Sequence, residues 1–273
     1  MTPESTGMQP ATATSTAGGE DRQVSRRRYR IQFGLWFVAL LVFLATCVII
    51  HDHPKPYSFD LSIAETVQGL KEPVWLRDVE IFPSILNNPT PSTVNLSTWF
   101  VGMLIIALIF RLRRRSPLVW LQSALFLVAT VLSAAGLNTL VDIIVNRPRP
   151  NPRLYPIHLY TALVPFPTYP SGHTEHDVAF YGFLFYLSFT KAVRTWRYHL
   201  WLIPLQIYAI YDILFIGYSR ILEGDHWFTD VIGGYLEGAI YLFFFIFLYR
   251  WVTTLLEKWR EGHAQKKHAV VAH

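Results

Sequence analysis

Two histidines and an aspartate stand at spacings that suit nucleophilic and acid catalysis. His226 and Asp230 are four residues apart, so on a helix they share one face and can form a hydrogen bond. Such a carboxylate fixes the tautomer of the imidazole, leaves its other nitrogen free for attack, and stabilises the positive charge that develops. His173 lies in a separate part of the chain and could then protonate a departing alkoxide.

Arginines and a helix start provide groups that could hold an anion beside these residues. Arg147, Arg149 and Arg220 each carry a planar fork of donors that matches phosphate and stays charged at any working pH. Ser171 and Gly172 stand at the expected start of a helix, where backbone N–H groups point outward at the positive end of the helix dipole. Gly172 also lets the chain approach a ligand closely. Phosphate is the anion that best fits such a site.

The composition of the chain suits a bilayer better than water. Of its 273 residues, 52% are hydrophobic and only 16% are charged, which is too apolar for an ordinary soluble domain. A helix needs about 20 apolar residues to cross roughly 30 Å of hydrocarbon. The chain is therefore predicted to be an all-α, six-transmembrane helical bundle. The six predicted spans are residues 33–50, 94–110, 118–145, 178–190, 200–218 and 227–251.

The distribution of basic residues predicts the orientation of this bundle. Lys and Arg collect on cytoplasmic segments of membrane proteins. With the N-terminus inside, seventeen of the 24 Lys and Arg residues fall on inner segments. Both termini are thus predicted to be cytoplasmic, in a multi-pass protein of the cell membrane, and the residues named above all fall on the extracytoplasmic side. The net charge of +5 then implies anionic lipid headgroups as neighbours and no nucleic-acid partner.

Three regions are predicted along the chain. Residues 1–28 are rich in small polar residues and are expected to form a disordered N-terminal tail, because they cannot offset ordering entropy by burial. Residues 29–255 form the membrane domain, and residues 256–273 form a basic C-terminal tail.

The first outer loop is predicted to carry a short amphipathic helix that begins behind Asp60 and Ser62 and ends near Pro73. Its apolar residues recur at helical spacing: Ile63, Val67, Leu70 and Val74. Residues 146–172 contain seven prolines and are expected to be extended or turning. Gly234 and Gly238 form a small-xxx-small pair, which close helix packing explains better than a ligand.

Two intact motifs and one altered motif resemble those of the type 2 phosphatidic acid phosphatase superfamily, which also includes bacterial polyprenyl diphosphate phosphatases and related haloperoxidases. The motif P-S-G-H stands at 170–173. The motif S-R-x5-H-x3-D stands as Ser219, Arg220, His226 and Asp230. The remaining motif, K-x6-R-P, ends at Arg149 and Pro150, but its lysine position holds Asp142.

Three interpretations of Asp142 stay open from the sequence. The carboxylate could pair with Arg147, Arg149 or Arg153 and so position the arginines. It could instead meet a cationic part of the substrate. In the third interpretation the site is weakened, because a carboxylate beside an anion reduces phosphate affinity unless it is paired or protonated.

The resemblance implies a role for each matching residue. It implies that Arg149, Arg220, Ser171 and Gly172 hold phosphate, that His173 is the acid, that His226 is the nucleophile, and that Asp230 is its partner. It implies no metal requirement, and no cofactor is expected. Asp142 is the expected modulator of the site.

The expected function is hydrolysis of a lipid phosphomonoester or diphosphate through a phosphohistidine intermediate. The lipid could be phosphatidic acid, lysophosphatidic acid, phosphatidylglycerol phosphate or a polyprenyl diphosphate. A lipid phosphotransferase would form the same intermediate and pass the phosphoryl-bearing group to an alcohol. A non-catalytic lipid-binding relative is the third alternative, which Asp142 alone favours. The intact His173, His226 and Asp230 weigh against it, because a binding protein needs no oriented nucleophile. The sequence leaves the oligomeric state open.

Overall fold

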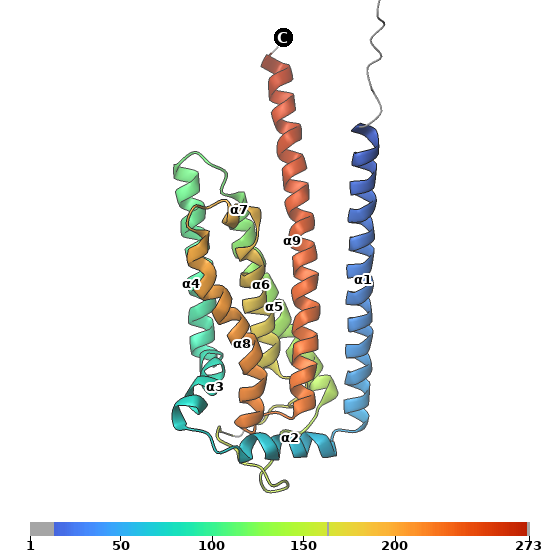
Figure 1. The fold of residues 1–273 in the computed structure, drawn as a ribbon, viewed down its shortest axis with the longest axis vertical. Helices are drawn as coiled ribbons and strands as arrows, with labels where there is room; N and C mark the ends of the chain where they lie inside the picture. Colours follow the sequence, from blue (N-terminus) through green and yellow to red (C-terminus); the bar gives the residue numbers. More distant parts are fainter. Residues whose placement is uncertain (1–13, 163, 272–273) are drawn as a thin grey trace, which may run out of the picture. The chain divides into compact units, whose positions relative to one another are not determined.

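The computed structural model describes residues 14–162 and 164–271, in which every regular element is a helix (Figure 1). The all-α prediction is therefore confirmed. The elements are α1 (Thr14–Asp52), α2 (Ser58–Gly69), α3 (Val74–Leu86), α4 (Pro89–Leu112), α5 (Leu118–Val145), α6 (Gly172–Ser188), α7 (Lys191–Arg194), the 3-10 helix η1 (His199–Leu202), α8 (Ile203–Leu222) and α9 (Phe228–Val271). The chain divides into two compact units, and the second, Phe43–His273, holds the bundle and the candidate site.

Five helical segments of the described chain are long and apolar enough to cross a membrane. They are Arg27–Asp52, Pro89–Leu112, Leu118–Val145, His199–Leu222 and Phe228–His263. These match five of the six predicted spans. The remaining prediction, residues 178–190, falls in α6, which has 17 residues and ends at Ser188. Since a span takes about 20 residues, the count of six stays a prediction.

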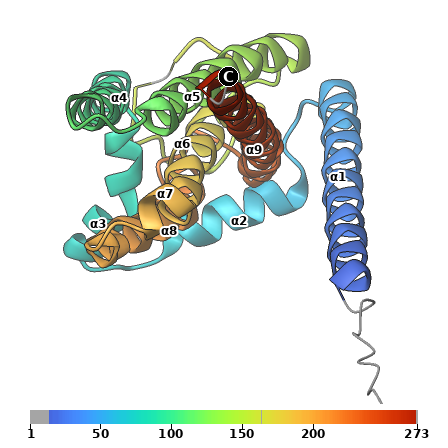
Figure 2. The same ribbon diagram turned by 90° about the horizontal axis from the view of Figure 1, so that it is seen from above.

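Helix α6 lies at the centre of the bundle, and this position explains its weaker signal as a span. It packs against α5, α8 and α9, as the view along the bundle shows (Figure 2). Most of its residues are buried, and Phe180 and Phe183 join Leu127 of α5 in the main apolar core. A helix surrounded by protein can carry polar residues such as Glu175 and Asp177 at positions that lipid would not tolerate.

Two glycines of α9 allow this helix to approach α6 closely. A Cβ at Gly234 would lie 2.5 Å from the Ser171 carbonyl oxygen, and one at Gly238 would lie 2.8 Å from that of Glu175. Because both obstacles are backbone atoms, a side chain at either position would push the helices apart. Close helix packing, as predicted for the pair, is what these glycines provide.

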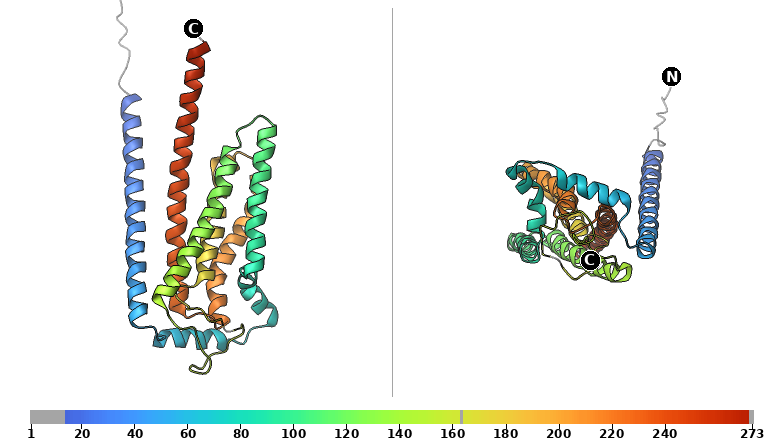
Figure 3. Two further views of the ribbon diagram at one scale, coloured as in Figure 1. Left: turned by 180° about the vertical axis from the view of Figure 1, so that it is seen from behind. Right: turned by 90° about the horizontal axis from the view of Figure 1, so that it is seen from below.

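The segment between the first two predicted spans contains two helices where one was predicted. Helix α2 ends at Gly69, and Pro73 is the residue at which α3 begins rather than the end of the preceding helix. Proline lacks an N–H and suits a helix start, so it separates two helices as readily as it terminates one. Helix α3 packs against α8, while α2 crosses the ends of α8 and α9 (Figure 3).

The predicted tails are more helical than expected where the structure describes them. Of the predicted disordered tail, residues 1–13 lie outside the described residues, and residues 14–28 belong to α1. Helix α9 continues through the predicted basic tail to Val271, and residues 272–273 lie outside the description. Extending an existing helix avoids the cost of a new nucleus, which favours such continuation. The division into three regions stays a prediction.

We expect Gly238→Ala to destabilise the bundle by about 1–3 kcal/mol, because the added methyl group overpacks the contact between α6 and α9. Thermal unfolding in detergent measures this effect. Gly136→Ala in α5 is the matched control, since a Cβ there meets nothing within 4 Å. Equal melting temperatures for the two variants would contradict the close-packing role.

Candidate active site

Arg147 is a fully buried arginine that joins α2 to α9. Helix α5 ends where Asn146 adopts a left-handed conformation, with φ of 50°, and turns the chain inward. The Arg147 guanidinium then donates to Asp60 Oδ2 at 2.9 Å and to Asp230 Oδ1, and both carboxylates are fully buried. Since its donors are used inside the protein, Arg147 holds the fold together and does not face a ligand.

His226 and Asp230 are connected through Thr168 rather than directly. His226 Nδ1 lies 3.8 Å from Asp230 Oδ2, which is too long for the direct hydrogen bond that the spacing predicted. Thr168 Oγ1 donates to Asp230 Oδ2 at 3.0 Å and lies 2.9 Å from His226 Nδ1. The same Asp230 oxygen accepts the Trp227 N–H at 2.8 Å. The carboxylate therefore orients the imidazole by way of a hydroxyl group.

The backbone of Thr168 determines the tautomer of His226. Its carbonyl oxygen lies 2.9 Å from His226 Nδ1 and can only accept a hydrogen bond, so Nδ1 must carry the proton. The lone pair is thus on Nε2, which lies 3.4 Å from the Arg149 guanidinium. Burial lowers the pKa of the His226 imidazole well below its ordinary value, and the charges of Arg149 and Arg220 lower this pKa further. These effects favour the neutral imidazole, whose Nε2 atom carries a lone pair.

Arg149 carries the charge that is least compensated within the site. Its guanidinium donates to the carbonyl oxygens of Phe166 at 3.0 Å and Asp225 at 3.1 Å. No ion pair includes Arg149 among the described residues. Carbonyl oxygens orient the guanidinium without neutralising it, so Arg149 keeps its attraction for an anion placed beside His226.

Arg220, in contrast, is neutralised by two carboxylates that the motif analysis did not single out. It donates to Glu223 Oε2 at 2.9 Å and to Asp225 Oδ2, and it also reaches Ser84 Oγ on α3. The i,i+3 spacing of Arg220 and Glu223 is a signal that sequence reasoning could have used. The Nε atom of Arg220 is buried and has no hydrogen-bond partner within the described chain, so one of its donors is not used by these carboxylates.

The start of α6 presents its first backbone N–H groups and His173 at the same end of the bundle. The Ser171 N–H donates to the Asp230 carbonyl oxygen at 3.0 Å, so Ser171 anchors this helix start to α9. A Cβ at Gly172 would lie 2.8 Å from Asn138 Oδ1, which explains the need for glycine there. His173 Nε2 is buried and has no hydrogen-bond partner within the described chain, while its carbonyl oxygen accepts from Asn87 at 2.9 Å.

Asp142 does not pair with an arginine. Its Oδ1 atom is buried and has no hydrogen-bond partner, and no ion pair of the described chain includes its carboxylate. The described chain therefore shows no ion pair for the first of the three interpretations, a pairing with Arg147, Arg149 or Arg153. Arg147 meets Asp60 and Asp230 instead, and Arg149 acts on Asp142 only through space.

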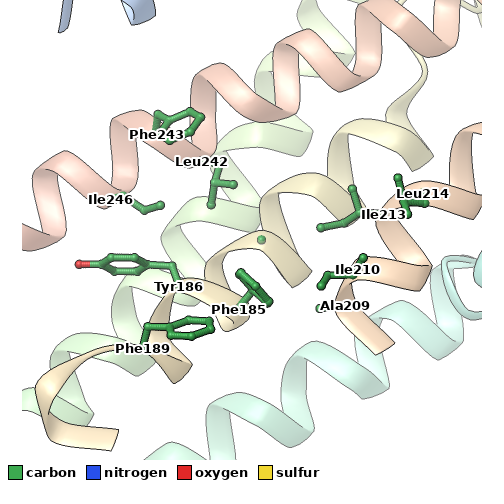
Figure 4. Close-up of a pocket in the computed structure, with 11 residues that line it drawn as sticks. Phe185, Tyr186, Phe189, Ala209, Ile210, Ile213, Leu214, Leu242, Phe243 and Ile246 are labelled. Atoms are coloured by element: carbon green, nitrogen blue, oxygen red, sulfur yellow. The ribbon is translucent and has the colours of Figure 1, made fainter. Parts of the chain in front are cut away.

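An apolar cleft of about 450 Å³ opens elsewhere in the bundle, between α6, α8 and α9 (Figure 4). Phe185, Ile213 and Leu242 are among the residues that line it. None of the predicted site residues does so, and Gly182 of the cleft lies ten residues beyond Gly172, or roughly 15 Å along the helix. The cleft has no group that would hold phosphate.

A metal centre is not apparent in the described residues. Within residues 14–162 and 164–271, no three His, Cys, Asp or Glu side chains are grouped so that they could hold a metal ion. The independence from metal that the family resemblance implies stays a prediction.

A family model described as the PAP2 superfamily matches residues 123–256, a range that contains every residue of the predicted site from Asp142 to Asp230. This part of the chain is a PAP2 superfamily domain. The chain is a multi-pass membrane protein. A comparison with curated proteins finds no match.

The fold agrees with this assignment. The chain is similar to the crystal structure of a transmembrane PAP2-type phosphatidylglycerolphosphate phosphatase from Bacillus subtilis, with a TM-score of 0.60 and 20% sequence identity. The similarity covers 78% of this chain and 94% of the other. At this identity the similarity establishes a shared PAP2 fold.

We expect Asp60→Ala to cost about 3–5 kcal/mol of stability, because it removes one partner of the buried Arg147 guanidinium. Thermal unfolding in detergent measures the loss. Glu65→Ala is the control on the same helix, since Glu65 is exposed and should change stability by about 0.5 kcal/mol at most. If Asp60→Ala unfolds at the wild-type temperature, Arg147 does not depend on this partner.

Proposed function

We propose that this PAP2 protein is a membrane lipid phosphatase that removes a phosphoryl group through a phosphohistidine on His226. The observation that carries the proposal is the hydrogen bond from His226 Nδ1 to the Thr168 carbonyl oxygen. It leaves the Nε2 lone pair beside Arg149, where a phosphate would sit. A histidine with a purely structural role would not need its unprotonated nitrogen beside a guanidinium that has no carboxylate partner.

The phosphate would be held by the groups that converge on this nitrogen. Arg149 supplies a positive charge that no carboxylate pairs with, and Arg220 adds a second guanidinium, whose buried Nε has no hydrogen-bond partner within the described chain. The Ser171 N–H already donates to the Asp230 carbonyl oxygen. The N–H groups of Gly172 and His173 have no partner within the helix, and together with the two guanidinium groups they would form the phosphate cradle. Ser171 then acts by fixing the position of this helix start.

The reaction would proceed in two steps. His226 Nε2 attacks phosphorus in line, the bond from phosphorus to the lipid oxygen breaks, and His173 gives its proton to that oxygen. Burial and the charge of Arg220 lower the pKa of His173, so this proton is held there only once the negative charge of the bound phosphate offsets the arginines. Asp230 and Thr168 stabilise the positive imidazole ring that forms. Water then attacks phosphorus and passes a proton to His173, the N–P bond breaks, and inorganic phosphate leaves with His226 neutral again.

The site is proposed to face the extracytoplasmic side, with both termini in the cytoplasm. The support is the distribution of charge, because seventeen of the 24 Lys and Arg residues lie on the segments assigned to the inside. Arg149 follows α5, His173 begins α6, and His226 joins α8 to α9, so all three lie at one end of the bundle (Figure 1). An amphiphile could keep its chains in the lipid there while it presents its phosphate.

We expect inorganic phosphate release from at least one of three lipids in detergent with EDTA present: phosphatidic acid, phosphatidylglycerol phosphate and a polyprenyl diphosphate. His226→Ala should lower the rate by about 10³-fold or more, because it removes the nucleophile. His53→Ala, at an exposed histidine, should keep the wild-type rate.

Release that needs EDTA to be absent would contradict metal-independent chemistry. Equal rates for wild type and His226→Ala would contradict the phosphohistidine. If no lipid releases phosphate but an added alcohol acquires the phosphoryl-bearing group, the protein is a phosphotransferase rather than a hydrolase.

A further inference from the structure

We propose that Asp142 selects a lipid phosphate that carries an ammonium group close to its phosphate. This inference rests on the proposed phosphatase function and adds the class of substrate. Asp142 stands where the family motif has lysine, so a carboxylate occupies a position at which a cation would attract the phosphate. We call the surroundings of Asp142 the acidic corner of the site. No ion pair within the described chain supplies a counter-charge for this carboxylate, and a cationic group on the substrate would supply one.

The backbone around Asp142 fixes it beside the catalytic groups. Asp142 lies in the last turn of α5, and its carbonyl oxygen accepts the Asn146 N–H at 2.9 Å, the bond that ends the helix. The chain then turns toward Arg147 and Arg149. The Asp142 carboxylate interacts electrostatically with Arg149 and Asp230. Arg149 lies beside Nε2 of His226, and Asp230 accepts a hydrogen bond from Thr168, which contacts Nδ1 of His226.

The cations near Asp142 are engaged with other groups. Arg147 is paired with Asp60 and Asp230, and Arg220 is paired with Glu223 and Asp225. Arg149 acts on Asp142 through space but directs its donors at the Phe166 and Asp225 carbonyl oxygens. A carboxylate oxygen of Asp142 is thus buried in the described structure without a donor.

A second buried acid lies beside Asp142. Glu237 of α9 is 1% exposed and interacts electrostatically with Asp142, and its Oε2 atom accepts from Asn138 at 2.7 Å. Asn138 lies one helical turn before Asp142, and its Oδ1 atom is 2.8 Å from the position of a Cβ on Gly172. The acidic corner therefore adjoins the proposed phosphate cradle at Gly172.

A carboxylate on Asp142 beside the phosphate cradle would select a substrate by its charge rather than by its shape. A carboxylate this close to the cradle repels a lipid that carries only a phosphate, which disfavours that substrate. A lipid with its own ammonium group turns the same carboxylate into an attractive partner, so affinity for one class and repulsion of the other arise from one residue.

The test compares matched lipids that differ only in this charge: long-chain alkyl phosphates with an amino group on the second, third or fourth carbon, and the N-acetyl derivative of each. Wild type should have a kcat/KM at least about tenfold higher for one or more of the amines than for its acetylated partner. Asp142→Asn should remove the preference, and Asp142→Lys should reverse it. Glu65→Gln, on the exposed face of α2, should keep it.

The variants separate this inference from the function on which it rests. If wild type hydrolyses amines and amides equally, or if Asp142→Asn keeps a preference for amines, the selection by Asp142 is wrong while the phosphatase function stands. If wild type releases no phosphate from any lipid, the phosphatase proposal fails and this inference fails with it. Asp142→Asn preserves side-chain shape, so it gives the answer even where Asp142→Lys does not fold.

Discussion

The buried guanidinium of Arg147 is the interaction on which the candidate site depends. It holds Asp60 of α2 and Asp230 of α9 at once, with all three side chains removed from solvent. Because Arg147 engages Oδ1 of Asp230, the other oxygen is free to accept from Thr168 and Trp227. Thr168 in turn fixes His226. A buried charge without its partners is costly, so the orientation of the imidazole is tied to the folding of this end of the bundle.

Three arginines differ in how their charge is used. Arg147 and Arg220 meet carboxylates, whereas Arg149 meets carbonyl oxygens and the His226 ring in the described structure. An arginine held by carbonyl groups is positioned and still charged, which suits the binding of a phosphate. Asp142 opposes this charge at a distance without an ion pair. The balance between Arg149 and Asp142 therefore decides which anions the site accepts.

Local patterns in the sequence predicted the features that depend on local residues. Five spans and the packing of Gly234 and Gly238 agree with the structure, because hydropathy and glycine spacing are properties of one segment. Thr168 is 58 residues from His226, and Asp60 is 87 residues from Arg147, so no spacing rule connects them. Helix α3 was missed because Pro73 suits a helix end and a helix start equally. Helix α6 has a weak span signal because protein, not lipid, surrounds it.

The central claim is that His226 forms a covalent bond to phosphorus, and trapping of the intermediate tests it most directly. The protein would be mixed with a lipid carrying a radioactive phosphoryl group, denatured in alkali within milliseconds, and separated from free lipid. Our account predicts label on wild type that survives alkali and is lost in acid, as expected of a phosphohistidine, and no label on His226→Ala. Label that persists in His226→Ala, or that survives acid on wild type, would contradict the account.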